Sequence, residues 1–184
     1  EKGNYVASVG GKNTKEYNLW RSMLSRCYSK YYHERCPTYV GCSVSENFKN
    51  FQFFAEWCNA QVGFGNKDWE LDKDILCKDN KQYGEDLCAF VPRVLNMTLT
   101  KSGATRGLYP IGVHWSTRGK KFKATLGVSG KMKYLGCYDT PDEAFTAYKG
   151  AKEVLIKEMA EKYKDYLDIR VYRTPMVWEV SIND

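Results

Sequence analysis

Residues 121–126, with the sequence KFKATL, alternate strictly between polar and apolar side chains. A period of two is that of a β-strand, so this segment is predicted to have one basic and one apolar face. Residues 127–130 (GVSG) are typical of a hairpin turn, and strands are expected near 110–115, 120–127 and 131–137. The pattern therefore predicts a three-stranded antiparallel sheet with a single apolar face.

A helix is predicted directly after this sheet, beginning at Thr140. Thr140 can cap the free N–H groups, Pro141 suits the first turn, and Glu143 completes a capping box. The buried stripe of the helix is expected to consist of Ala144, Ala147, Tyr148, Ala151, Leu155 and Met159. Because several of these residues are small, the helix can lie close against the sheet.

Basic residues are concentrated around the predicted sheet. Residues 101–138 contain eight Lys and Arg residues and no acid, whereas residues 1–100 contain 13 bases and 12 acids, in a chain of net charge +6. Charge of one sign attracts phosphate through Coulomb energy and counterion release. A solvated basic face is the alternative, but the aromatic residues among these bases favour nucleic-acid binding.

Residues 109–153 resemble the Apetala-2/ethylene-response-factor DNA-binding domain. The matching residues are Gly112-Val113, Gly119-Lys120, Phe122-Lys123-Ala124, Tyr134-Leu135-Gly136, Tyr138-Asp139-Thr140, Glu143-Ala144 and Ala147-Tyr148. The resemblance implies a sheet that lies in the major groove of double-stranded DNA. The implied DNA-binding residues are His114, Trp115, Arg118, Lys120, Lys121, Lys123, Thr125, Lys131 and Lys133.

The chain departs from that family where His114, Ser116 and Gly127 stand in place of family arginines. Guanidinium forks contact guanine through two hydrogen bonds, whereas lysine acts as a point charge. Weaker or different sequence selectivity is therefore expected, with contact to the DNA backbone retained. A small α+β module for protein contact is the alternative interpretation of residues 109–153.

The first hundred residues show helix signals followed by two strands. Helices are expected from Thr14 through Tyr28 and from Asn47 to Cys58, ended by glycines at 63 and 65. Residues 69–77 and 87–91 are expected to be strands joined by a polar turn at 78–86, and a short helix follows Pro92. The expected order is therefore strand, loop, strand, helix.

Residues 69–96 resemble the His-Asn-His (HNH) nucleases of phage and homing-endonuclease type, which are also called ββα-metal nucleases. Upstream residues that support the resemblance are Trp20, Met23-Leu24, Arg26-Cys27-Tyr28, Pro37, Tyr39, Phe51, Phe54 and Trp57. Some phage proteins of this kind also carry an Apetala-2-like module. The pairing of the two resemblances implies a DNA endonuclease more strongly than either alone.

The HNH resemblance implies a site for one divalent cation that binds a phosphate oxygen while a general base activates water. Asp72 and Asn96 would hold Mg²⁺ or another hard cation. Lys73 stands where the family has its catalytic histidine, and Leu87 replaces a common polar residue. Tyr83 or His33 would be the substitute bases; the alternative is that residues 72–74 form an ion-paired turn on a degenerate scaffold.

Cysteine and hydropathy patterns limit other functions. The seven cysteines include no Cys-x-x-Cys pair and the chain has two histidines, which argues against a zinc site and favours reduced, buried thiols. No run of eighteen apolar residues and no leader pattern occurs, so neither a membrane partner nor export is expected. We expect a location in the cytoplasm, associated with the nucleoid of a host cell if the protein is phage-encoded.

The expected fold is α+β, with an N-terminal ββα-metal (HNH-like) domain and flanking helices, and a C-terminal three-stranded antiparallel sheet packed on one helix. The expected domains are 1–100 and 108–165, with a linker at 101–107 and an unplaced extension at 166–184 that holds strand-like runs near 169–172 and 177–182. The expected function is metal-dependent cleavage of DNA. The alternatives are a catalytically inactive DNA-binding regulator and a phage protein that binds a host protein through aromatic residues such as Tyr31 and Tyr32.

Overall fold

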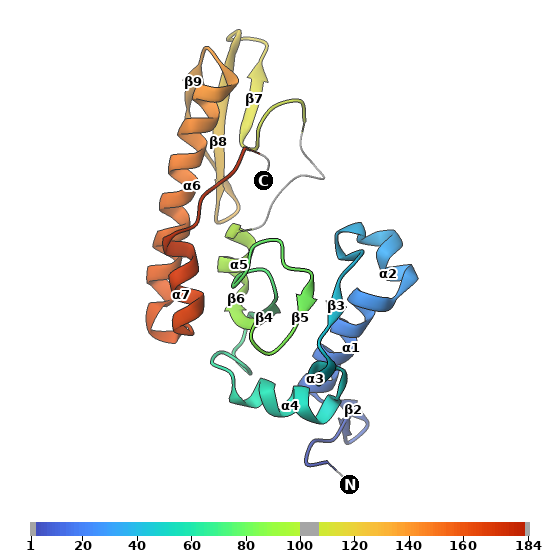
Figure 1. The fold of residues 1–184 in the computed structure, drawn as a ribbon. Helices are drawn as coiled ribbons and strands as arrows, with labels where there is room; N and C mark the ends of the chain where they lie inside the picture. The colour runs from blue at the N-terminus through green and yellow to red at the C-terminus, as the bar shows by residue number, and fades with distance from the viewer. Residues whose placement is uncertain (1–2, 100–106, 183–184) are drawn as a thin grey trace. The chain divides into compact units, whose positions relative to one another are not determined.

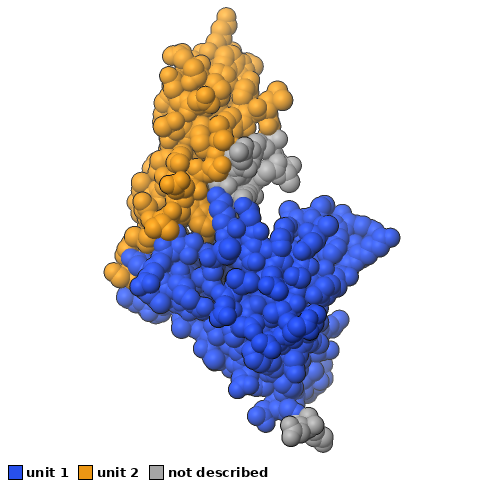
Figure 2. All heavy atoms as spheres, viewed as in Figure 1, with its two compact units in different colours: residues 1–96, 165–174 blue, residues 97–164, 175–184 orange. Residues whose placement is uncertain are grey.

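The computed structural model describes residues 3–99 and 107–182. The chain forms two compact units, one of residues 1–96 with 165–174 and the other of residues 97–164 with 175–184 (Figure 2). Both helices and strands are present, and the mixed α+β class is confirmed. No helix in the described ranges has the length and apolar character needed to cross a membrane.

The first unit opens with a short hairpin and a set of helices (Figure 1). Strands β1 (Ser8–Val9) and β2 (Lys12–Asn13) precede helix α1 (Lys15–Tyr28), which Thr14 caps by accepting a hydrogen bond from the backbone N–H of Tyr17. Helix α2 (Lys30–Arg35) and the 3₁₀ turn η1 (Pro37–Tyr39) follow. The predicted start of the first helix at Thr14 is confirmed.

The helix expected over 47–58 is instead two helices, α3 (Glu46–Lys49) and α4 (Phe51–Ala60). Asn50 interrupts them because its side-chain oxygen accepts hydrogen bonds from the backbone N–H groups of Gln52 and Phe53. A residue that caps a helix with its side chain leaves the helical conformation itself, so α3 ends where α4 begins.

Four short strands build two small sheets in this unit. Strand β3 (Ser43–Val44) pairs in parallel with β5 (Gln82–Tyr83), and β4 (Trp69–Asp72) pairs antiparallel with β6 (Ala89–Pro92). Helix α5 (Arg93–Leu99) follows β6 directly, so β4, β6 and α5 occur in the order strand, strand, helix.

The strand expected over 69–77 ends at Asp72. Asp72 Oδ1 accepts hydrogen bonds from the backbone N–H groups of Asp74 and Ile75, at 2.8 and 2.7 Å, and so turns the chain away from the sheet. The segment expected to be only a polar turn, 78–86, contains β5. The core of the unit packs buried side chains of the helices and strands, among them Met23, Phe48, Phe54, Cys58, Leu71, Tyr83, Cys88 and Phe90.

The second unit contains the predicted sheet and helix. Strands β7 (Val113–Ser116), β8 (Lys121–Val128) and β9 (Lys131–Tyr138) form an antiparallel sheet with β8 in the middle. Helix α6 (Pro141–Tyr163) packs against the sheet, and Thr140 and Glu143 form the predicted capping box. Ala124, Leu126, Ala144 and Tyr148 are buried between the sheet and α6.

The strand-like runs near 169–172 and 177–182 are not strands. Residues 169–176 form helix α7 (Ile169–Met176), after the 3₁₀ turn η3 (Lys164–Tyr166), because Asp168 accepts a hydrogen bond from the backbone N–H of Arg170 and so starts a helix. Residues 177–182 have no regular structure, and Val180 is buried with its N–H bound to Glu153 Oε1 at 2.9 Å. Residues 101–106 of the expected linker lie outside the described residues.

Candidate functional site

A cleft of about 170 Å³ lies in the first unit, where α1, β4 and α5 meet. Its lining is largely polar and comes from segments far apart in the sequence. The lining residues are Leu19, Ser22, Met23, Arg26, Tyr39, Glu70, Leu71, Asp72, Lys73, Asp74, Tyr83 and Asn96. The three residues predicted to carry catalysis, Asp72, Lys73 and Asn96, therefore line one cleft.

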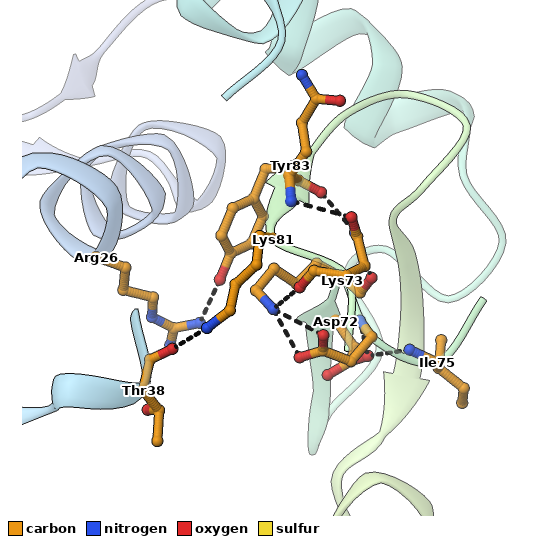
Figure 3. A network of polar contacts seen from close by, with 10 residues as sticks. Arg26, Thr38, Asp72, Lys73, Ile75, Lys81 and Tyr83 are labelled. Atoms are coloured by element: carbon orange, nitrogen blue, oxygen red, sulfur yellow. Dashed lines mark hydrogen bonds and ion pairs between the residues drawn. The ribbon is translucent and has the colours of Figure 1, made fainter. Parts of the chain in front are cut away.

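Asp72 is the last residue of β4 and lines this cleft. Figure 3 shows its hydrogen bond with the backbone of Ile75. Burial raises the pKa of its carboxyl, because the charged form loses contact with water. Hydrogen bonds from the backbone of Ile75 and Asp74 and from the Asn96 side chain act in the opposite direction on the pKa. A proton and a cation would thus compete for this carboxylate.

Asn96 connects two carboxylates of β4. Its Nδ2 donates to Glu70 Oε1 at 2.8 Å, and its side chain also forms a hydrogen bond with Asp72. Glu70 and Asp72 lie two residues apart on one strand, so their side chains share a face. Glu70 was not among the predicted site residues, although its spacing from Asp72 on a predicted strand is a signal that identifies it.

Lys73 is a nearly buried cation whose three N–H donors are all used. Its Nζ donates to both oxygens of Asp74, at 2.7 and 2.8 Å, and to the backbone oxygen of Asn80 at 2.5 Å (Figure 3). Asn80 returns a hydrogen bond from Nδ2 to the Lys73 carbonyl at 2.8 Å. These contacts fix the loop that follows β4 and leave the Lys73 ammonium group with no free N–H donor.

Arg26 enters the cleft from α1. Its Nη1 lies 3.5 Å from the hydroxyl oxygen of Tyr83 (Figure 3). Its guanidinium lies over the Tyr39 ring at 5.4 Å. The Nε atom is buried and has no hydrogen-bond partner within the described ranges. Among the same residues Arg26 forms no ion pair, and its side-chain contacts are those with Tyr83 and Tyr39.

The two bases considered as substitutes for Lys73 are placed differently. Tyr83 lines the cleft, but burial raises the pKa of its hydroxyl, which makes the phenolate harder to form. His33 Nε2 lies 2.8 Å from the backbone oxygen of Arg26, on the helix that follows α1. His33 is not among the side chains that line the cleft.

Carboxylate and amide oxygens are ligands suited to Mg²⁺. Three carboxylates (Glu70, Asp72 and Asp74) and the Asn96 amide line the cleft. No group of three or more His, Cys, Asp and Glu residues suited to a metal occurs in the part of the chain that the structure describes. A cation held by Asp72 and Asn96 would keep several water or phosphate ligands, as Mg²⁺ usually does. In this structure the N–H groups of the Asn96 amide face the carboxylates. The amide would have to rotate to bring its oxygen towards a cation.

Only some of the predicted DNA-binding residues lie together on one face of the sheet in the second unit. His114, Lys123 and Cys137 lie side by side on neighbouring strands, and Thr125 lies opposite Tyr134. These residues alternate with Ala124 and Leu126, which are buried against α6, so they occupy the outer face of the sheet. His114 and Tyr134 are exposed, and Lys123 and Thr125 are half-buried.

Lys131 and Lys133 do not belong to this outer face. They pair with Val128 and Leu126, and Lys133 lines a groove of the helix side together with Glu158 of α6. Trp115 pairs with Phe122 and packs on its ring at 4.8 Å, which also assigns it to the helix side. The expectation of one face for all nine residues is therefore wrong, because a bulge after Ala124 and the tight turn at Ser129-Gly130 set the register of β9.

The remaining predicted DNA-binding residues lie at the β7–β8 turn. Arg118 and Lys120 are exposed, and Lys120 adopts a positive φ of 48° within the turn. Lys121, which begins β8, forms an exposed ion pair with Asp139 at 2.9 Å. Such exposed pairs contribute little free energy, so Lys121 can exchange Asp139 for another anion.

Comparisons with models of protein families, with curated proteins and with solved structures found no match to this chain. The HNH and Apetala-2 resemblances thus stay predictions from the sequence.

Proposed function

We propose that this protein binds double-stranded DNA and cleaves it with the aid of a divalent cation bound in the cleft of the first unit. The observation that carries the proposal is the convergence of Glu70, Asp72 and Asn96 at one cleft that also holds the unpaired guanidinium of Arg26. Anionic and cationic groups in one cleft suit a phosphodiester bound together with a metal ion.

Each residue of the cleft has a distinct role in this proposal. Asp72 and Asn96 would hold the cation, which when bound would supply charge stabilisation at the phosphate. Arg26 donates hydrogen bonds to the phosphate oxygens. Glu70 accepts a proton from the attacking water, because the Lys73 side chain is occupied by its hydrogen bonds to Asp74 and Asn80. Lys73 thus positions the loop.

The second unit contributes DNA binding through the outer face of its sheet. Lys123 and His114 lie on that face, and Arg118 and Lys120 extend from the β7–β8 turn. A sheet of this size fits the major groove of DNA, where long side chains reach both base edges and phosphates. Binding is expected to weaken steeply with salt.

The test is incubation of the full chain with supercoiled plasmid and Mg²⁺, Mn²⁺, Ca²⁺ or Zn²⁺, beside a binding assay without metal. The parent is expected to nick the plasmid with Mg²⁺ or Mn²⁺. Asp72→Ala and Glu70→Gln are expected to lower the rate about 100-fold or more, with unchanged binding. Glu56→Gln, at an exposed acid of α4, is the control and should cut at the parental rate. Equal rates in all four proteins would refute the assignment of the site.

A second candidate function is a DNA-binding regulator on an inactive nuclease scaffold. The observation in its favour is the saturated Lys73, which stands where the family has its catalytic histidine. This candidate predicts salt-dependent binding of the same plasmid and no nicking with any of the four cations. The plasmid experiment therefore decides between the two functions.

A further inference from the structure

Two large side chains occupy the outer face of the sheet where lysines were expected. Met132 and Tyr134 of β9 are 70% and 60% exposed, and they pair with Gly127 and Thr125 of the central strand. The neighbouring pair on that face is Lys123 with Cys137. An apolar patch of Met132 and Tyr134, which we call the β9 patch, thus lies beside a lysine.

The geometry of the β9 patch keeps it open towards a partner. Gly127 has no side chain to cover Met132, and a Cβ atom at Gly127 would lie 3.8 Å from the Met132 sulfur. The Tyr134 hydroxyl donates to Cys137 Sγ at 3.1 Å, which restrains its ring on the face of the sheet. Both side chains are therefore presented at the surface of the sheet instead of being packed in a core.

The charge around the β9 patch indicates an anionic partner. Lys123 and His114 continue the outer face, and Arg118 and Lys120 lie at the turn that connects their strands. Residues 107–138 contain no Asp or Glu. In DNA the apolar group offered to a protein in the major groove is the C5-methyl group of thymine, and its phosphates flank that groove.

We propose that the β9 patch contacts thymine methyl groups, so that the second unit selects A·T base pairs by apolar contact while its lysines and arginine bind phosphate. This inference rests on the proposed DNA binding and specifies which base the sheet recognises. Direct readout through Met132 and Tyr134 would replace the arginine–guanine contacts that this chain lacks at His114, Ser116 and Gly127.

The test compares duplexes that differ only in the thymine methyl group. Binding of the full chain to poly(dA)·poly(dT) and to poly(dA)·poly(dU) is measured by competition against a fluorescent duplex, with EDTA present to prevent cleavage. Each methyl group buried is expected to strengthen binding about fourfold. The parent should therefore prefer the thymine duplex, and the double variant Met132→Ala/Tyr134→Ala should bind both duplexes equally.

Two controls separate this inference from the proposed function. Val154→Ala removes an exposed apolar side chain of α6 and should keep the parental preference for thymine. Lys123→Gln should weaken binding to both duplexes by the same factor, since phosphate contacts do not depend on the base. A parent that binds both duplexes equally tightly overturns the inference and leaves DNA binding intact, whereas a parent that binds neither overturns both. A preference that survives in the double variant also overturns the inference.

Discussion

The Asn96 side chain on α5 donates a hydrogen bond from Nδ2 to Glu70 Oε1 on β4 at 2.8 Å. Because Asn96 also binds Asp72, a single amide holds two carboxylates that would otherwise repel each other. The amide thus connects the strand and the helix of the strand–strand–helix segment and sets the geometry of the cleft.

Asn96→Ala is expected to lower the rate of plasmid nicking about 10- to 100-fold, because the variant loses both a side chain that would hold the cation and the amide that orients Glu70 and Asp72. The variant should stay folded, because Asn96 is only half-buried. Nicking rates and thermal melting measured on the same preparation check this expectation. A parental rate for Asn96→Ala would remove this residue from the site.

Asp72→Asn is expected to abolish nicking and to raise the melting temperature at neutral pH. Burial raises the pKa of Asp72 above its ordinary value of 3.8, so the folded protein binds this proton more tightly than the unfolded chain. The free energy of unfolding contributed by Asp72 therefore falls as pH rises from about 4 through the pKa of the folded state. The asparagine is never charged, and its oxygen can still accept from Asp74 and Ile75.

Melting curves of Asp72→Asn and the parent at several pH values check the direction of this pH dependence. The difference in melting temperature should be near zero at pH 3.5 and should increase towards pH 7. Glu56→Gln, at an exposed carboxyl, should show no such trend. A difference that shrinks as pH rises would mean that the native protein stabilises the charged form of Asp72.

Local signals in the sequence predicted much of the fold. Thr14 and the Thr140–Glu143 capping box indicated where two helices begin, and the alternation of residues 121–126 indicated strand β8. Each of these signals depends only on residues that are neighbours in the sequence. The register of β9 could not be predicted in this way. It depends on a bulge opposite Ala124 and Thr125, and a slip of one residue moves Lys131 and Lys133 to the other face.

Some residues of the cleft could be predicted because they lie in one local segment of the sequence. Asp72 and Asn96 belong to one short segment, and a family motif indicated them. Arg26 and Tyr39 reach the cleft only because α1 and the 3₁₀ turn η1 lie beside β4, and no local pattern contains that contact. The ends of segments also escaped prediction where a side chain bonds to the backbone, as at Asn50 and Asp168.

The variant Lys73→Arg tests whether Lys73 positions the loop after β4 or acts as the general base. Arginine keeps the charge and the donors that bind Asp74 and Asn80 but does not give up its proton at ordinary pH. Nicking by Lys73→Arg is therefore expected to stay within about threefold of the parent, whereas Lys73→Met should destabilise the fold by about 1–3 kcal/mol. Urea unfolding and nicking rates measure the two effects. Loss of nicking in a stable Lys73→Arg variant would assign proton transfer to Lys73.

Two glycines of the second unit are expected to respond oppositely to alanine. Gly112 has a φ of +75°, and a Cβ atom there would meet the Tyr148 ring at 2.0 Å. Gly112→Ala should thus destabilise the unit by about 1–3 kcal/mol. Gly150 lies in α6 with open space around its Cα, so Gly150→Ala should stabilise the helix by about 1 kcal/mol. Denaturant unfolding of both variants tests this, and two changes of the same sign would contradict the packing of α6 on the sheet.

Lys123 and Lys133 provide a matched pair for the outer face of the sheet. Both are lysines on paired strands, but Lys123 lies opposite His114 on the outer face, whereas Lys133 lies opposite the buried Leu126 beside α6. The slope of log binding constant against log salt should fall by about 0.9 for Lys123→Gln, since one phosphate contact is lost, and should stay at the parental value for Lys133→Gln. Anisotropy titrations of a 20-base-pair duplex between 50 and 200 mM salt measure both slopes. The reverse result would mean that DNA meets the helix side of the sheet, and the β9 patch would then face away from it.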